Sequence, residues 1–217
     1  MDIEQARYNM VEQQIRPWDV LNQSVLDLLF KLRREDFVPT PHRALAFVDM
    51  EIPLGHGESM WTPKLEARVV QELTLSPRDR VLEIGTGTGY LTALLAAQAS
   101  EVVSVDIHAD FTAAARDKLR AHGIANVSLQ TGDAALDWYD QDGFDAIVLT
   151  GSTPLLPEAF RRRLCVGGRL FAVTGTGPVM QAQLIVCTAP GAFRSVTLFE
   201  TCLAPLVNAP QPAAFVF

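Results

Sequence analysis

Cysteine is scarce in this 217-residue chain, which contains only three. Cys165, Cys187 and Cys202 stand far apart, and none belongs to the paired spacing that holds a metal ion. Because their number is odd, the three cysteines cannot all form disulfide bonds within the chain. We therefore expect three buried, reduced thiols, and neither a metal centre nor a structural disulfide.

Long hydrophobic runs are missing as well. No apolar run approaches the roughly 20 residues that cross a bilayer. The first residues, Met1 to Gln5, lack the basic charge that begins a secretory leader. We expect a cytoplasmic protein without a membrane partner.

Positive charge is in short supply. The chain has 18 Lys and Arg against 25 Asp and Glu, a formal net charge of -7. Its one basic cluster, Arg161 to Arg163, is expected to be the solvated face of a helix. Nucleic-acid partners need a basic surface, and Thr150 to Pro154 lacks the Asn/Asp-Pro-Pro-aromatic pattern of base amino-group methylation. We expect no nucleic-acid partner.

Apolar residues, by contrast, make up 48% of the chain, enough for one substantial core. Strands are predicted at 81–84, 102–105, 127–129, 144–149 and 169–173, and helices at 91–97, 111–122 and 157–164, the last ended by Gly167-Gly168. Such alternation requires a parallel sheet covered on both faces. Turns at 175–178 and 189–192 leave room only for antiparallel strands at the end. We predict an α/β, doubly wound, mostly parallel, Rossmann-like sheet.

The N-terminal quarter is predicted to be an extension of this single domain, which covers residues 1–217. Apolar residues recur at helical spacing within 5–38, so this segment should be mainly helical. Pro53, Gly55 and Gly57 should make 47–61 an irregular, rigid loop. Thr62 and Pro63 then begin a helix as N-cap and first helical residue. We divide the domain into an extension with its loop, 1–62, and a core, 63–217.

The stretch Val81 to Tyr90 carries most of the chemistry. An apolar strand runs into Gly85, Gly87 and Gly89, which let the backbone turn sharply and approach a ligand closely. A helix should follow, with its amide-rich N-terminus toward the ligand. A dinucleotide site would place its third glycine at the position of Tyr90. The bulky ring there disfavours a pyrophosphate ligand.

Three carboxylates at successive strand ends favour a cationic ligand instead. Glu83 is expected at the lip of the first strand, and Asp106 ends the next strand about 20 residues on, where a ribose hydroxyl pair would lie. Asp133 follows the third strand, where it would meet an adenine ring. Each alone could be a helix cap. Together they favour S-adenosyl-L-methionine, whose ammonium and sulfonium groups are positive.

Several segments carry a family resemblance together. They are Arg33 to Pro39, Ile52 to Gly57, Val81 to Tyr90, Gly132-Asp133, Phe144 to Thr150, Leu156-Pro157 and Pro205 to Val207. The glycine turn is general among methyltransferases, but the loop and the C-terminal segment narrow the likeness. Over nearly its whole length the chain resembles the protein-L-isoaspartate O-methyltransferase family.

The resemblance implies methyl transfer from S-adenosyl-L-methionine to the free α-carboxylate of an L-isoaspartyl (or D-aspartyl) residue in a damaged protein or peptide. The ester then closes spontaneously to a succinimide, which can reopen to normal aspartate. A carboxylate with a pKa of about 3.5 is already ionised at neutral pH, so no general base is required. The enzyme has only to align the oxygen with the methyl carbon and exclude water.

The resemblance also implies roles for individual residues. Positions matching the family's cofactor motifs are Glu83, Gly85, Thr86, Gly87, Gly89, Asp106, Ile107, Asp133, Ala134 and Thr150. Ser59 and Thr62 are the catalytic candidates, and His56, Trp61 and Val207 are the substrate-binding candidates.

Two departures from the family pattern leave the substrate open. Trp61 stands where the family has a substrate-binding serine, and Asn208 where it has a small residue. Ser59 or Thr62 could replace the serine by a small shift of the loop. The alternatives are a same-fold enzyme acting on another peptide or small-molecule carboxylate, and a non-catalytic cofactor binder. In each case the protein is expected to be a monomer or a dimer. Intact Glu83, Asp106 and Asp133 argue against the non-catalytic binder.

Overall fold

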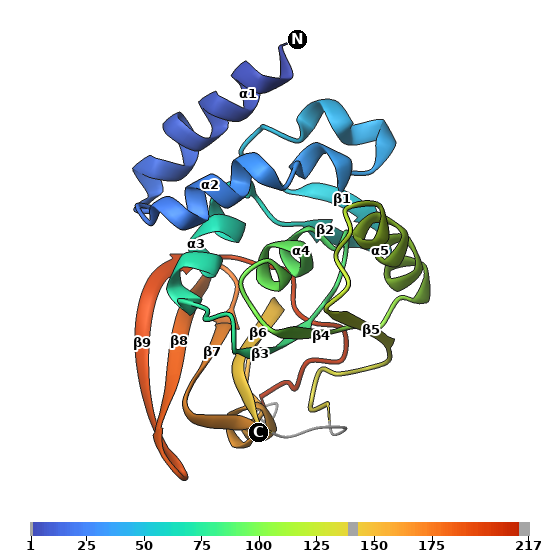
Figure 1. Ribbon diagram of the computed structural model, residues 1–217. Coiled ribbons are helices and arrows are strands. Elements are labelled where there is room, and N and C mark those ends of the chain that lie inside the picture. The colour runs from blue at the N-terminus through green and yellow to red at the C-terminus, as the bar shows by residue number, and fades with distance from the viewer. Residues whose placement is uncertain (1, 139–142, 213–217) are drawn as a thin grey trace.

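A seven-stranded sheet forms the centre of the protein in the computed structural model, which describes residues 2–138 and 143–212 (Figure 1). The strands lie in the order β5-β4-β3-β6-β7-β8-β9. Their bounds are β3 (Arg80–Ile84), β4 (Glu101–Asp106), β5 (Val127–Thr131), β6 (Phe144–Thr153), β7 (Leu164–Thr176), β8 (Val179–Ala189) and β9 (Ala192–Thr201). The first five are mutually parallel and the last two antiparallel. The predicted fold class is confirmed.

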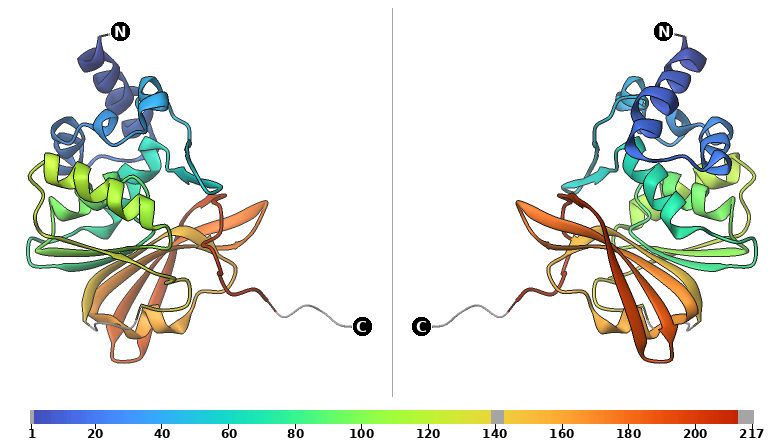
Figure 2. Two further views of the ribbon diagram at one scale, coloured as in Figure 1. Left: turned by 90° about the vertical axis from the view of Figure 1, so that its right-hand side faces the viewer. Right: turned by 90° about the vertical axis from the view of Figure 1, so that its left-hand side faces the viewer.

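Helices cover the two faces of this sheet unequally. Figure 2 shows α3 (Pro63–Leu73), α4 (Tyr90–Ala96) and α5 (Ala109–Ala121) on one face, and the short α6 (Glu158–Arg162) on the other. Because side chains alternate along a strand, neighbouring residues of β3 enter different cores. Val81 packs in the larger apolar cluster and Leu82 in the smaller one, both fully buried.

The N-terminal segment is helical but interrupted. It contains α1 (Ile3–Asn9), a π-helical stretch η1 (Met10–Ile15), a 3-10 turn η2 (Arg16–Trp18), α2 (Gln23–Lys31), and two further 3-10 turns, η3 (Arg34–Asp36) and η4 (Thr40–Leu45). The side chains of Asp2 and Asn22 cap α1 and α2 by accepting bonds from first-turn amides. Val25, Leu26 and Leu29 form the buried stripe that packs α2 onto the core.

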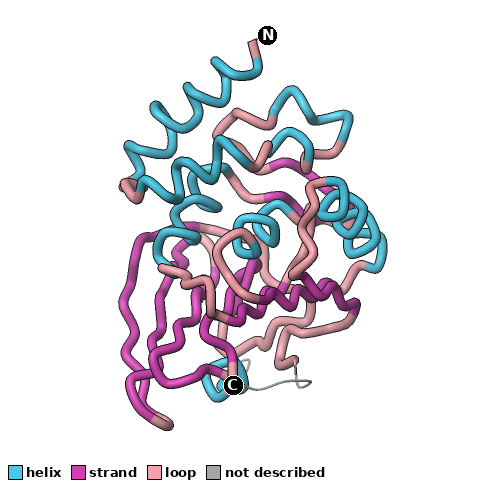
Figure 3. The backbone as a smooth tube through the Cα atoms, in the orientation of Figure 1, coloured by secondary structure: helices cyan, strands magenta, loops and turns pink. Residues whose placement is uncertain are grey.

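The predicted irregular loop at 47–61 is wrong, because this segment contains a β-hairpin (Figure 3). Strand β1 (Ile52–Gly55) pairs with β2 (Glu58–Met60) in antiparallel register. The turn uses three consecutive residues with positive φ: Gly55 at 107°, His56 at 55° and Gly57 at 84°. The glycines therefore close a tight turn, and Pro53 is tolerated because a two-stranded sheet leaves edges open.

The predicted end of the last helix is also wrong. Helix α6 ends at Arg162, and Gly167 and Gly168 lie within β7. A Cβ at Gly168 would fall 2.9 Å from the Cys165 carbonyl oxygen and 3.0 Å from that of Phe144. Glycine is needed there for close backbone approach between strands rather than for a helix cap.

Two side-chain expectations need correction as well. Arg163 does not belong to a solvated face: it is 9% exposed and donates two hydrogen bonds to Asp137. All three cysteines are free, but only Cys187 is buried, Cys165 is half-buried, and Cys202 is exposed. Among the residues that the structure describes, none of the helices combines the length and apolar character that a bilayer crossing needs.

Candidate active site

One cavity lies at the carboxyl ends of the parallel strands, where β3 and β6 adjoin and the strand order reverses. Ligands of open α/β sheets bind at such a switch point. The walls of the cavity come from the glycine turn after β3, the segment from Asp106 to His108 at the end of β4, the residues after β5, and Thr150 of β6. The β1–β2 hairpin and the segment from Leu203 to Val207 complete it.

The glycine turn requires glycine for steric reasons at two positions. Gly85, Gly87 and Gly89 all have positive φ, at 100°, 50° and 82°. A Cβ at Gly85 would fall 1.9 Å from the Thr150 Oγ1 atom, and one at Gly89 would fall 3.0 Å from the Ala115 Cβ. Gly85, Thr86 and Gly87 line the cavity as predicted, whereas Gly89 lies outside its wall as the residue before α4.

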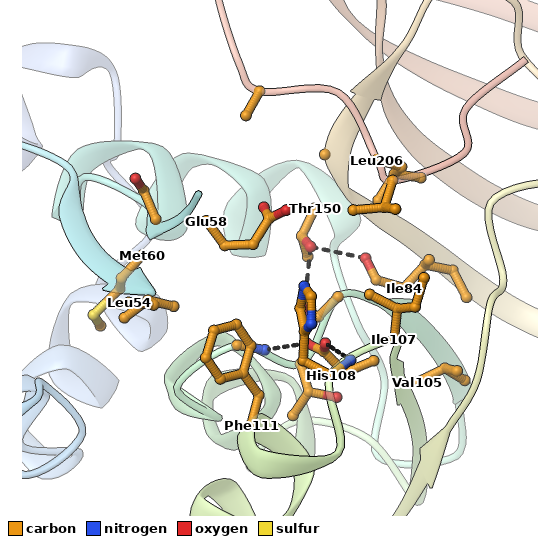
Figure 4. A pocket seen from close by; sticks show the side chains of 18 of the residues that line it. Leu54, Glu58, Met60, Ile84, Val105, Ile107, His108, Phe111, Thr150 and Leu206 are labelled. Atoms are coloured by element: carbon orange, nitrogen blue, oxygen red, sulfur yellow. Dashed lines mark hydrogen bonds between the residues drawn. The ribbon is translucent and has the colours of Figure 1, made fainter. Parts of the chain in front are cut away.

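Thr150 ties the turn to the neighbouring strand. Its hydroxyl donates to the Ile84 carbonyl oxygen at 2.8 Å and lies 3.1 Å from that of Gly85 (Figure 4). The hydroxyl proton is therefore used within the protein, and Thr150 presents its remaining surface to the cavity.

Asp106 stands at the edge of the cavity where the sequence places it. Its carboxylate accepts a hydrogen bond from the Gly87 amide at 2.8 Å and another from the His108 amide at 2.9 Å. The side chain is 6% exposed, and the neighbouring Ile107 also lines the cavity. A carboxylate with two oxygens has further lone pairs for the hydroxyl groups of a ligand.

Glu83 does not lie at the lip of the strand, so that expectation is wrong. The side chain is fully buried beneath the turn and is absent from the cavity wall. One carboxyl oxygen accepts bonds from Thr92 Oγ1 at 2.5 Å and Ser104 Oγ at 2.6 Å, and the other has no partner in the described part of the chain. Burial raises the pKa of Glu83 to about 8.

Glu83 still communicates with the cavity through hydroxyl groups. Ser104 donates to Glu83, and the Thr86 hydroxyl lies 2.6 Å from Ser104. Since Thr86 lines the cavity, the buried carboxyl supports the turn from below. Glu83 supports the turn, and does not contact a ligand, because its side chain points away from the cavity. The sequence pattern does not specify this direction.

Asp133 meets the C-terminal segment at the far wall of the cavity. One carboxylate oxygen accepts from the Ala135 amide at 3.1 Å, and the other from Asn208 Nδ2 at 2.7 Å. Ala134 and Val207 line the cavity beside it. Asn208, which departs from the family pattern, therefore links the C-terminal segment to the residues that follow β5.

The hairpin supplies the opposite wall, including Leu54, Glu58, Ser59 and Met60. Ser59 is exposed, and its hydroxyl has no hydrogen-bond partner among the described residues. Thr62 lies outside the wall, and its hydroxyl accepts from the Leu65 amide at 3.4 Å as the N-cap of α3. Of the two catalytic candidates, the structure brings only Ser59 to the cavity.

Trp61 lines the cavity although it is only 7% exposed. Its ring packs edge-on against Phe171 with centroids 6.1 Å apart, and its carbonyl oxygen accepts from Arg34 at 2.5 Å. Arg34 also donates to Glu66 at 2.9 Å. Sequence reasoning assigned neither Arg34 nor Glu66 to the site, although Arg34 lies in a segment that carries the family resemblance.

The cavity wall bears carboxylates but no lysine or arginine among the described residues. The five acidic residues are Glu51, Glu58, Glu66, Asp106 and Asp133. Burial raises the pKa of Glu66 to about 7 despite its contact with Arg34, and partial burial raises that of Glu51. Apolar side chains such as Leu91, Val105 and Phe111 fill the remaining wall. Such a site suits a ligand that combines positive charge with apolar surface.

His56 is placed differently from the prediction. It lies outside the cavity wall, with its Nε2 atom 3.0 Å from the Asp110 carboxylate. The structure therefore brings together most of the predicted site residues, and leaves Glu83, Gly89, His56 and Thr62 around rather than within the wall.

Comparison with known proteins gives one consistent family. The family described as Protein-L-isoaspartate(D-aspartate) O-methyltransferase (PCMT) matches residues 5–209. The protein-L-isoaspartate O-methyltransferase of Koribacter versatilis is 33% identical over 202 residues, which cover 93% of this chain and 90% of that protein. That of Myxococcus xanthus is 38% identical over 189 residues, 86% of this chain and 89% of that protein.

A solved structure shares the fold. It is a crystal structure of a putative protein-L-isoaspartate O-methyltransferase from Plasmodium falciparum in complex with S-adenosyl-L-homocysteine. The TM-score is 0.79 at 17% identity, and the match covers 95% of this chain and 98% of that one. At this identity the likeness concerns the fold alone.

Proposed function

This chain belongs to the protein-L-isoaspartate(D-aspartate) O-methyltransferase family, and from that premise we propose that it methylates L-isoaspartyl (D-aspartyl) residues of damaged proteins with S-adenosyl-L-methionine. The observation that carries the proposal is the meeting of four segments at one cavity. The glycine turn, Asp106, Asp133 and Ser59 come from separate parts of the chain and line the same hollow.

The residues present fit the methyl donor. Asp106 offers free lone pairs at the end of β4 for ribose hydroxyl groups, and Ile107 and Ala134 offer apolar surface for the adenine. Gly85 and Gly87 line the cavity without a side chain, and the absence of lysine and arginine from the described wall suits a cation. When bound, the donor supplies a methyl group on positively charged sulfur.

Ser59 and the apolar residues of the cavity wall are proposed to bind the methyl acceptor, the isoaspartyl carboxylate. An isoaspartyl α-carboxylate is ionised at neutral pH, so the protein needs to orient it and exclude water rather than remove a proton. The free hydroxyl of Ser59 can donate a hydrogen bond to this carboxylate. Leu54, Met60, Trp61 and Leu206 form the apolar surroundings in which bulk water is displaced.

The proposed function extends to the domain organisation of the chain and to the class of its substrate. Residues 1–217 act as one domain, in which the extension 1–62 supplies the hairpin wall and the core 63–217 supplies the donor site. The buried contact between Arg34 and Glu66 supports this unity. The substrate is protein or peptide rather than nucleic acid, which the net charge of -7 and the acidic cavity support.

The test is a methyl-transfer assay with labelled S-adenosyl-L-methionine and two peptides of one sequence, containing either isoaspartate or aspartate. We expect base-labile label in the isoaspartyl peptide only. The Asp106→Ala variant should lose this activity by about tenfold or more, because it removes bonds from the turn and from the donor. Equal labelling of both peptides would contradict the proposal.

A specific observation favours a second candidate, a methyltransferase of this fold that acts on a different carboxylate. Trp61 places a large ring in the wall where a serine would place a small hydroxyl group, and this ring makes a T-shaped contact with Phe171. If the natural protein fails to methylate isoaspartyl peptides while Trp61→Ser gains the activity, this second candidate is correct.

A further inference from the structure

Four side chains attach the tip of the β1–β2 hairpin to the β4–α5 loop and the first turn of α5, and we call them the clasp: His56 of the hairpin, His108 of the loop, and Asp110 and Phe111 of α5. The His56 Nε2 atom lies 3.0 Å from the Asp110 Oδ2 atom. The rings of His56 and His108 stack with centroids 4.1 Å apart and planes 9° apart. The Phe111 ring forms T-shaped contacts with both histidines, with its centroid 5.4 Å from that of His56 and 5.2 Å from that of His108.

The backbone is shaped to present His56 at this place. His56 has φ of 55° between two glycines that also have positive φ. A non-glycine residue adopts this conformation uncommonly, and it persists where surrounding contacts hold it. The stacking and hydrogen bonding of the clasp are such contacts.

The clasp lies at the border of the cavity. His108 and Phe111 line the cavity, and Figure 4 shows their side chains beside each other among the lining residues. His108 follows Asp106 by two residues and donates its amide to that carboxylate. The clasp therefore connects the hairpin to the segment that we propose holds the donor's ribose.

A second contact joins the hairpin to the donor side. A Cβ built at Gly87 would lie 3.4 Å from the Leu54 Cδ1 atom, so Leu54 sits directly over the glycine turn. The hairpin that carries Ser59 thus touches the turn and the β4–α5 loop, and its inner side forms one wall of the cavity. Release of His56 would free the tip of this wall.

We propose that His56 is a positioning residue, which holds the hairpin over the cavity and thereby sets how tightly the protein retains the methyl donor and its demethylated product. The inference rests on the proposed function only for the identity of this ligand. His56 touches neither the cavity nor the reacting groups, and it acts through His108, Asp110 and Phe111.

A metal ion is a different reading of the same residues. His56, His108 and Asp110 offer ligand atoms within 4.8 Å of one another. A metal must lie in the plane of each imidazole that binds it, and two nearly parallel stacked rings cannot share such a point. The first turn of α5, a helix of 13 residues, also disfavours a cation. Direct contact between the side chains explains the geometry better.

The experiment measures the dissociation constant and the dissociation rate of S-adenosyl-L-homocysteine on the full chain, without any acceptor. We expect His56→Ala to bind about five- to tenfold more weakly, through faster dissociation. His56→Phe should keep part of the affinity, because it retains a ring that can stack on His108. Asp110→Asn should also bind more weakly than wild type, because it weakens the contact with His56. Melting temperatures should stay close to wild type, because His56 and Asp110 are exposed.

The matched control is Asp117→Asn, which removes one acidic charge from the same helix at an exposed residue without a partner in the described chain. It should bind within about twofold of wild type. The loss of binding free energy in the double variant His56→Phe/Asp110→Asn should be smaller than the sum of the losses in the two single variants, because both substitutions act on the same hydrogen bond. In the methyl-transfer assay, His56→Ala should raise the KM for the methyl donor by a larger factor than it changes kcat.

Three results would overturn the proposal: unchanged binding in His56→Ala, losses that merely follow a fall in melting temperature, or loss of wild-type binding on addition of a chelator. Failure of the proposed function is distinguishable from these. A protein that binds S-adenosyl-L-homocysteine with the expected His56 dependence, yet methylates no isoaspartyl peptide, would refute the substrate and leave the clasp standing.

Discussion

Arg34 and Glu66 form an ion pair in which the Arg34 Nε atom donates to the Glu66 carboxylate at 2.9 Å, and both side chains are almost completely buried. The pair joins the 3-10 turn η3 of the N-terminal segment to helix α3. Through its other nitrogens Arg34 also donates to the carbonyl oxygens of Ala46 and Trp61. One buried cation therefore fixes the chain on both sides of the hairpin.

Replacement of Arg34 by methionine should destabilise the protein by about 3–5 kcal/mol, because Glu66 would remain buried without its partner. Urea denaturation measures this change. The control is Arg43→Met, which breaks the largely exposed pair with Asp36 and should cost no more than about 1 kcal/mol. Equal losses in the two variants would show that the buried pair has no special role.

Glu83→Gln should flatten the pH dependence of stability. The pKa of Glu83 is raised by burial to about 8, whereas glutamate in an unfolded chain titrates near a pKa of about 4.3. Between these values the folded protein keeps a proton that the unfolded chain releases, so stability is highest below this window and is lost as the pH rises through it.

The measurement is the free energy of unfolding between about pH 5 and about pH 8, where removal of one such group reduces the slope by up to about 1.4 kcal/mol per pH unit. Glu200→Gln, at an exposed residue without a partner in the described chain, is the control and should leave the slope unchanged. An identical slope in Glu83→Gln and wild type would mean that Glu83 does not keep its proton.

Glu58→Gln should improve the use of an anionic acceptor. The Glu58 carboxylate lines the cavity without a partner among the described residues, and Figure 4 shows the side chain reaching toward Thr150. Its repulsion of an isoaspartyl carboxylate should amount to about 1 kcal/mol in this partly solvated site. We expect the KM for an isoaspartyl peptide to fall about fivefold. A rise in this KM would instead place Glu58 in contact with the acceptor.

Gly85→Ala should be far more damaging than Gly123→Ala. Both glycines have positive φ, but a Cβ at Gly85 would fall 1.9 Å from Thr150 Oγ1, whereas none of the described atoms lies within 4 Å of one at Gly123. Gly123→Ala should cost about 1–2 kcal/mol for its backbone conformation alone. Gly85→Ala adds a steric cost of about 1–3 kcal/mol or more and should weaken donor binding. Thermal unfolding and calorimetric titration of the donor separate the two effects.

Local order along the chain was predictable where neighbouring residues decide it. The apolar run Val81 to Ile84, the glycines that follow, and the Thr62-Pro63 helix start appear in the structure as expected. Strand ends of a parallel sheet meet at one edge, so Asp106 and Asp133 could be placed together. Periodicity, turn conformation and capping are properties of short segments.

The sequence by itself therefore determined the parallel sheet, the glycine turn and the family, because short-range preferences and recurring motifs suffice for these. Only the tertiary structure decided that Glu83 is buried beneath the turn, that His56 stacks on His108, and that Arg34 reaches Glu66. These contacts join residues distant along the chain, and they depend on side-chain direction and burial. Both arise when the segments pack, since the partner that gives each residue its role lies elsewhere in the sequence.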